Sequence, residues 1–167
     1  ANGTFTLTGF YERRARRILP ALFVVLLACL PFAWAWLLPS DLKAFARSLA
    51  AAAISLSNIL FWRESGYFDT SSELKPLLHT WSLGVEEQYY MVFPLLLLGL
   101  ARWRPHWTPH VLWAGAALSL ALAQWAALHQ PSLAFYLLPT RGWELLAGAL
   151  LAYYHSRPAP RIPHAAA

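Results

Sequence analysis

The side chains best suited to chemistry gather around two adjacent carboxylates, Glu86 and Glu87, at the start of an apolar segment. His79 precedes them, and two phenols, Tyr89 and Tyr90, follow. On a helix the carboxylates share faces with the phenols, and the positive N-terminal end of the helix dipole favours them. One interpretation is a pair of exposed carboxylates at an interfacial helix start. The other is catalytic: Glu86 or Glu87 orients a histidine such as His79 or acts as a general base, and the tyrosines contact substrate.

A second group is the run of arginines at Arg13, Arg14, Arg16 and Arg17. Such a run can serve only as a positive-inside anchor for the apolar segment that follows. Alternatively, Arg14 and Arg17 lie three apart on one helical face and form a clamp for phosphate, which guanidinium groups bind with a fork of donors. A phosphorylated cytosolic donor such as a coenzyme A thioester would bind there.

Arg141 and Glu144 form a third candidate group, three residues apart at a predicted helix start. The two side chains can pair as a structural contact or line a polar substrate pocket, and both interpretations stay open. No metal site is expected, because only His106 and His110 have a helical ligand spacing and Pro109 lies between them.

The composition indicates that lipid, not water, surrounds these groups. Hydrophobic residues make up 58% of the 167 residues and charged residues only 13%, against about 25% charged in soluble domains. The net charge of +5 stands in clusters beside apolar runs. Aromatics are not interleaved with it on a polar face, so nucleic acid is not an expected partner. Ionisable groups at membrane depth are costly and usually line a cavity, which favours the functional interpretation of Glu86 and Glu87.

The elements that would position these groups are predicted to be helices of an all-α, polytopic transmembrane bundle. We expect a cytoplasmic loop and basic collar over 1–17, a transmembrane region over 18–154 and a Pro-rich tail over 155–167. The uncharged first run is long enough to cross about 30 Å of hydrocarbon. The predicted helices cover 18–38, 42–61, 82–100, 111–128 and 142–154.

The arginine clusters conflict with a simple topology for these helices. If Arg13 to Arg17 is cytoplasmic, as the positive-inside rule indicates, three full crossings place Arg102 and Arg104 on the far side. Either one segment is re-entrant, or the rule fails at that loop.

Three stretches, in this order, closely resemble the acyltransferase 3 family of membrane proteins. They are FYERRARRILPALF, then SNILFW followed by PLLHTWSLGVEEQYYMVFPLLL, then FYLLPTRGWELLAGALLA. The resemblance covers roughly residues 10–154, and the family includes O-antigen and peptidoglycan O-acetyltransferases. It implies about ten transmembrane helices in the bacterial inner membrane. It also implies transfer of an acetyl group from cytosolic acetyl-CoA to a hydroxyl of a cell-surface carbohydrate.

The same resemblance implies roles for individual residues. An Arg-x-x-Arg pair that is associated with the acyl donor corresponds to Arg14 and Arg17. A Glu-Glu-Gln segment corresponds to Glu86, Glu87 and Gln88, and an FYLLPTR-x-WE motif corresponds to Arg141, Trp143 and Glu144. Family members also carry, on their first helix, a basic residue followed eleven positions later by a catalytic histidine, and no arginine or lysine here is followed in that way. We therefore expect that helix to precede Ala1, and the chain to be a fragment that is inactive alone.

Two other function classes stay open. In a transporter or flippase for a glycan precursor or an acyl group, the same polar residues would line a path and no bond would change. A transporter is expected to show pseudo-repeated, broken helices, and the sequence shows none. A non-catalytic membrane subunit is the third possibility.

Overall fold

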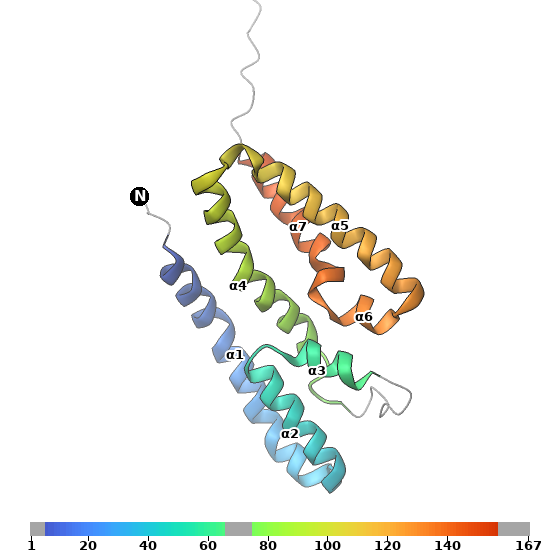
Figure 1. Cartoon of the computed structure of the whole chain (residues 1–167). Helices are drawn as coiled ribbons and strands as arrows, with labels where there is room; N and C mark the ends of the chain where they lie inside the picture. Colours follow the sequence, from blue (N-terminus) through green and yellow to red (C-terminus); the bar gives the residue numbers. More distant parts are fainter. Residues whose placement is uncertain (1–5, 66–74, 157–167) are drawn as a thin grey trace, which may run out of the picture.

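A computed structural model describes residues 6–65 and 75–156, and this part of the chain consists of helices and their connections, without strands (Figure 1). The first five residues and nearly all of the expected Pro-rich tail lie outside the described residues. The elements are α1 (Leu7–Trp36), α2 (Pro39–Ala53), α3 (Ser57–Glu64), α4 (Thr80–Trp103), the short 3₁₀ helix η2 (Pro105–Trp107), α5 (Thr108–His129), α6 (Pro131–Tyr136) and α7 (Leu138–His155).

Residues 7–17 of the expected cytoplasmic loop and basic collar form the first part of α1. Thr6 caps this helix, because its side-chain oxygen accepts a hydrogen bond from the N–H of Gly9 at 3.3 Å. The helix has 30 residues and is therefore about 45 Å long. The arginines consequently have fixed directions on a helical surface.

The prediction of a single helix over 42–61 is wrong, because the helix is interrupted between Ala53 and Ser57 and forms α2 and α3. Ser55 takes a left-handed conformation with φ 58°. Its N–H bonds the carbonyl of Ala52 at 3.1 Å, and the N–H of Leu56 bonds the carbonyl of Ala51 at 2.8 Å. This is the Schellman pattern that ends a helix, with serine where glycine is usual. The sequence carries no glycine or proline here to signal it.

The later helices begin earlier than their apolar runs suggest. Helices expected from 82, 111 and 142 start at Thr80, Thr108 and Leu138. In α5 and α7 a proline occupies the first turn, where its missing N–H costs nothing and its fixed φ suits the helix. The connection before α7 contains α6, a helix of six residues that the sequence did not predict.

The helices form two connected groups (Figure 1). α1 and α2 form an antiparallel hairpin, and α5 and α7 pack along each other with the short α6 at one end. α4 joins the groups and runs antiparallel to α1, since the hydroxyl of Tyr11 donates to the carbonyl of Met91 at 2.8 Å and Arg14 contacts Glu87 further back along α4. The start of α1 and the end of α4, with Arg102, therefore point toward the same end of the molecule.

The core of the first group lies between α1, α2 and the turn before α4. It is a cluster of buried apolar side chains: Leu22, Leu26, Ala33, Phe45, Ala52 and Leu77. α3 packs against α4 at Gly84, which is buried beneath it. The close approach of these two helices brings together the two parts of the second motif, SNILFW and the segment that carries Glu86 and Glu87.

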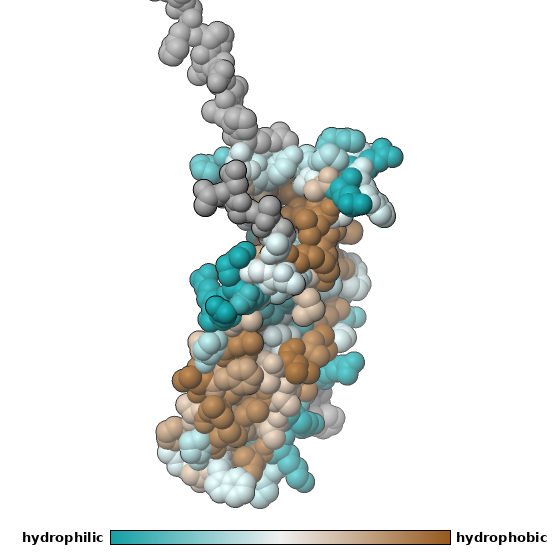
Figure 2. Space-filling view, turned by 90° about the vertical axis from the view of Figure 1, so that its left-hand side faces the viewer, coloured by the Kyte–Doolittle hydropathy of each residue, from teal (hydrophilic) through white to brown (hydrophobic). Residues whose placement is uncertain are grey.

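Much of the outer surface is apolar. Among the described residues, two helical segments are long and apolar enough to cross a membrane, Leu7–Trp36 and Pro105–His129. Large apolar side chains such as Val24, Leu27 and Leu118 are exposed on them. Figure 2 shows a broad hydrophobic area over the lower part of one face, where Figure 1 places α1 and α2, with hydrophilic patches above and beside it. Contiguous apolar surface of this kind is covered by lipid or protein rather than water.

Two glycines of α4 form a matched pair for testing the α3–α4 contact. A Cβ at Gly84 would stand 2.9 Å from Asn58 Oδ1 and 3.2 Å from the carbonyl oxygen of Ser55, whereas one at Gly99 would meet nothing within 4 Å. Gly84→Ala is expected to lower the free energy of unfolding by about 1–3 kcal/mol through overpacking. Gly99→Ala is expected to raise it by about 0.5–1 kcal/mol. Thermal unfolding in detergent micelles measures both, and equal effects of the two variants would contradict the packing described here.

Candidate functional site

The charged contact between α1 and α4 is an ion pair of Arg14 and Glu87. Arg14 Nη2 donates to Glu87 Oε1 at 2.6 Å, and the two side chains are only 21% and 23% exposed. The guanidinium carbon also lies 3.4 Å from the centre of the Tyr90 ring, a cation–π contact. Arg14 Nε is buried and has no hydrogen-bond partner among the described residues. Shielding from water makes this pair stronger than a surface ion pair.

A cavity of about 240 Å³ lies beside this ion pair, and we call it the α1–α4 cavity. Arg14, Glu87 and Tyr11 supply its polar wall, and Ile18 and Leu22 belong to its apolar wall. Ser55, at the break between α2 and α3, also lines this cavity. A site with charge at one side and hydrocarbon at the other suits a ligand that is itself part polar and part apolar.

The structure does not bring all the predicted residues to this cavity. Arg17 is exposed on α1, so the two arginines of the expected clamp differ: one is paired, and the other is open to a ligand. Glu86 is exposed on α4, and His79 is exposed at the position preceding that helix. Within the described residues no hydrogen bond or ion pair joins His79 to either carboxylate, from which it is separated by about two helical turns, or roughly 10 Å.

The tyrosines that follow the carboxylates also separate. Tyr90 lies under Arg14, whereas Tyr89 is buried and stacks on Phe93 with ring centres 4.7 Å apart. Of the two tyrosines predicted to contact substrate, the structure therefore places only Tyr90 beside the ion pair.

Two amide side chains that the sequence did not single out as a pair connect α3, α4 and α6. Gln88 Nε2 donates to Asn58 Oδ1 at 2.8 Å and to the carbonyl of Ser55 at 3.1 Å. Asn58 Nδ2 donates to Gln88 Oε1 at 3.3 Å and to the carbonyl of Tyr136 at 3.2 Å. Asn58 is completely buried. The sequence did carry a signal for this pair, since Asn58 is an amide inside an expected transmembrane run and buried amides are hydrogen-bonded.

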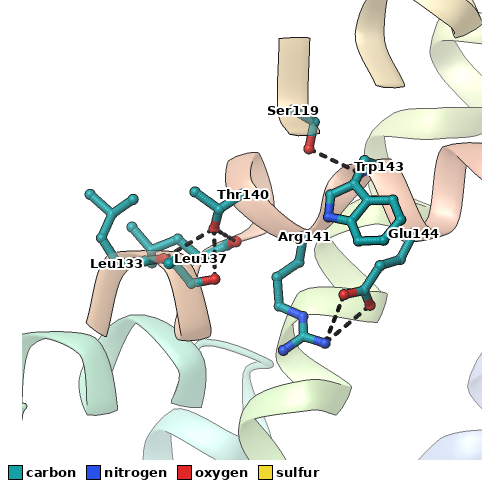
Figure 3. Close-up of polar contacts among 8 residues, drawn as sticks. Ser119, Leu133, Leu137, Thr140, Arg141, Trp143 and Glu144 are labelled. Carbon is teal, nitrogen blue, oxygen red and sulfur yellow. Dashed lines mark hydrogen bonds and ion pairs between the residues drawn. The ribbon is translucent and has the colours of Figure 1, made fainter. Parts of the chain in front are cut away.

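The third group lies at the start of α7. Arg141 Nη2 donates to both carboxylate oxygens of Glu144, at 2.9 and 3.1 Å (Figure 3). The guanidinium carbon lies 5.0 Å from the centre of the Trp81 ring and 5.8 Å from that of Phe135. Both ionic side chains line a cavity of about 430 Å³ between α5, α6 and α7, which we call the α5–α7 cavity.

Neutral hydrogen bonds hold the start of α7 in place (Figure 3). The hydroxyl of Ser119 on α5 donates to the carbonyl of Pro139 at 2.7 Å and accepts from the N–H of Trp143 at 2.9 Å. The buried hydroxyl of Thr140 lies within hydrogen-bond distance of carbonyls of α6, including that of Leu133 at 3.0 Å. Hydrogen bonds with α5 and α6 thus fix the backbone position of Arg141.

Motif residues from three distant stretches therefore meet in two charged groups joined by one amide pair, within an all-helical chain of largely apolar surface. These are the features of a helical domain of the membrane type. The acyltransferase domain family (Acyl_transf_3) matches residues 2–166, and the chain belongs to this family. The match confirms the family resemblance that the motifs indicated.

Known relatives agree with this family. The chain is 38% identical over 92% of its length to a *Haemophilus influenzae* protein of unassigned function, of which it spans 65%. It is 30% identical over 97% of its length to the peptidoglycan O-acetyltransferase OatA of *Listeria monocytogenes*, of which it spans 27%. It is 29% identical over 88% of its length to the O-acetyltransferase OatA of *Staphylococcus aureus*, of which it spans 25%. No solved structure matches.

A double-mutant cycle tests the shielded ion pair. Arg14→Gln, Glu87→Gln and the double variant are expected to give a coupling free energy of about 1–3 kcal/mol, because each single change leaves a shielded charge unpaired. The matched control is Arg16 with Glu12, a pair also joined at 2.6 Å but 79% and 59% exposed, for which about 0.3–0.5 kcal/mol is expected. Unfolding in detergent measures both cycles, and equal couplings would show that Arg14 and Glu87 are not shielded.

Proposed function

We propose that the chain is part of an integral membrane O-acyltransferase that moves an acetyl group from cytosolic acetyl-CoA to a hydroxyl of a cell-surface carbohydrate. The observation that carries the proposal is the shielded Arg14–Glu87 pair at the wall of the α1–α4 cavity. The family match supports acyl transfer, and the name of the OatA relatives supports O-acetylation.

The reaction needs from the protein a base for the acceptor proton and donors for the developing negative charge. The acceptor oxygen attacks the thioester carbonyl, a C–O bond forms as the C–S bond breaks, and the thiolate leaves and takes up a proton. The proton of the acceptor hydroxyl passes to a base, which Glu86 or Glu87 orients or provides, with His79 as a further candidate. Negative charge develops on the carbonyl oxygen and is stabilised by donors such as the remaining N–H groups of Arg14.

The donor is proposed to bind at the arginines of α1. Arg17 is exposed one helical turn from Arg14, and its guanidinium fork suits a phosphate group of coenzyme A. The apolar wall of the α1–α4 cavity suits the less polar arm that carries the thioester. In this arrangement Arg17 binds the phosphate of the donor, and the reaction takes place near Arg14.

The basic residues also support an orientation in the inner membrane, with several helices crossing it. Because α1 and α4 are antiparallel, the arginines at the start of α1 point toward the same end as Arg102. The positive-inside rule assigns that end to the cytoplasm. In this proposal the break after α2 belongs to a re-entrant segment, which is one of the two explanations that the arginine clusters allow.

One observation favours a transporter as the second candidate. α2 and α3 are interrupted around Ser55, α6 and α7 are interrupted at Leu137, and the two interruptions are bonded through Asn58. Transporters place substrate sites where broken helices meet. An acyltransferase that carries an acyl group across a membrane would use the same feature.

Radiolabelled acetyl-CoA distinguishes the two candidates. Membranes holding the whole protein are incubated with acetyl-labelled donor, and the label is measured in the carbohydrate fraction before and after mild alkali, which removes O-acetyl esters. Alkali-labile label in carbohydrate is the expected result. Label confined to the donor, together with loss of glycan export when the protein is deleted, would support the transporter instead.

Arg17→Ala is expected to raise the KM for acetyl-CoA about tenfold or more while leaving the unfolding temperature unchanged. The reason is that loss of one charge-assisted phosphate contact costs about 1.5–3 kcal/mol, and Arg17 is exposed in the described structure. Arg13→Ala, at another exposed arginine of the same helix, is the matched control and should change the KM much less. A rise of the same size in both variants would indicate general electrostatic attraction rather than a specific phosphate contact.

A further inference from the structure

The α5–α7 cavity combines aromatic faces with hydrogen-bonding groups. Phe135 and Trp143 line it, together with Arg141, Glu144 and Gln124. Its volume of about 430 Å³ falls in the range of small-molecule sites, about 300–1,000 Å³. It is distinct from the α1–α4 cavity, with which it shares no lining residue.

Gln124 marks this cavity as a place that receives a polar ligand. Between Val111 and Leu128, α5 carries only two polar side chains, Ser119 and Gln124. Ser119 is used in fixing α7. Gln124 is exposed at the cavity wall and makes no hydrogen bond to another described residue. An amide on an apolar helix is costly in a membrane unless something bonds it.

The aromatic groups around Arg141 extend this surface beyond the cavity wall. The rings of Trp81 and Phe135 lie with centres 4.5 Å apart, and the guanidinium of Arg141 lies over both. A sugar ring has an apolar C–H face and an edge of hydroxyls. Aromatic faces suit the former, while the donors of Arg141 and the donor and acceptor of Gln124 suit the latter.

The position of the cavity agrees with such a ligand. It lies along the second half of α5, beside α6 and the first half of α7. The opposite end of the same helices adjoins η2 and the end of α4, which carries Arg102. If that basic end is cytoplasmic, the cavity lies toward the other side of the membrane, where a cell-surface carbohydrate is located.

We infer that the α5–α7 cavity is the acceptor site and binds a carbohydrate, with Gln124 and Arg141 as hydrogen-bonding residues and Phe135 and Trp143 as stacking surfaces. The inference rests on the proposed function for its direction in the membrane. It adds to that function a site that binds the acceptor away from its reacting hydroxyl, which must still reach the thioester beside Arg14 and Glu87, and a new specificity residue, Gln124.

The test measures the KM of each substrate separately, with the whole protein in nanodiscs. The acceptor probe is a tetrasaccharide of β-1,4-linked N-acetylglucosamine, and the donor is acetyl-CoA. Gln124→Leu and Phe135→Ala are expected to raise the acceptor KM about tenfold or more and to leave the donor KM unchanged. Leu118→Ala, at a side chain 72% exposed on the same helix and outside the cavity lining, is the control and should change neither. An unchanged acceptor KM in both cavity variants would overturn the inference while the transferase function stands.

A binding measurement separates this inference from the proposed function. If membranes holding the wild-type protein give no alkali-labile label in the carbohydrate fraction, the proposed function fails, and saturation-transfer NMR with the same tetrasaccharide then decides the inference. Signal that Gln124→Leu abolishes and Leu118→Ala retains supports a carbohydrate site. Signal that is absent, or equal in the wild type and Gln124→Leu, overturns it.

Discussion

The amide pair of Asn58 and Gln88 is the contact on which the other described contacts depend. Helical structure is interrupted around Ser55 and again after Tyr136, and each interruption leaves a carbonyl without a helical donor. Where such groups are buried away from water, as beside the fully buried Asn58, the protein must supply the donors. Gln88 donates to the carbonyl of Ser55, Asn58 donates to that of Tyr136, and the two amides bond each other. Every polar group of the pair thus serves to close one of the two breaks or to join them.

This pair also sets the direction of the charged groups. Gln88 and Glu87 are neighbours on α4 and lie about 100° apart around the helix, so fixing Gln88 against α3 turns Glu87 toward Arg14 on α1. On the other side, the bond to Tyr136 holds α6, and Phe135, the residue before Tyr136, lines the α5–α7 cavity. The two cavities are therefore positioned by a single bonded core, even though their lining residues come from different helices.

The sequence predicted what depends on spacing within one helix, and it missed what depends on distance along the chain. Arg141 and Glu144 are three residues apart and pair in the structure as the helical spacing indicated. Arg14 and Glu87 are separated by 73 residues, and no local pattern could connect them. The spacing of Arg14 and Arg17 predicted one common clamp, because a shared helical face says nothing about a third group that can pair with one member. The break at Ser55 was missed because a left-handed serine has no local signal as strong as glycine.

The same break accounts for both the topology and the site. If one continuous helix followed α1, it would return the chain along the full length of α1. α4 would then run parallel to α1, and Arg102 would lie at the opposite end of the molecule from the start of α1. The Ser55 carbonyl would be used within that helix, and Gln88 would lose an acceptor that fixes the rotation of α4. Because α2 stops after 15 residues, or about 22 Å, the chain reaches α4 only part of the way back along α1, and α4 runs toward the end from which α1 began. Irregular backbone away from water is tolerated only where protein bonds it or a cavity adjoins it, and Ser55 meets both conditions, since it is bonded to Gln88 and lines the α1–α4 cavity.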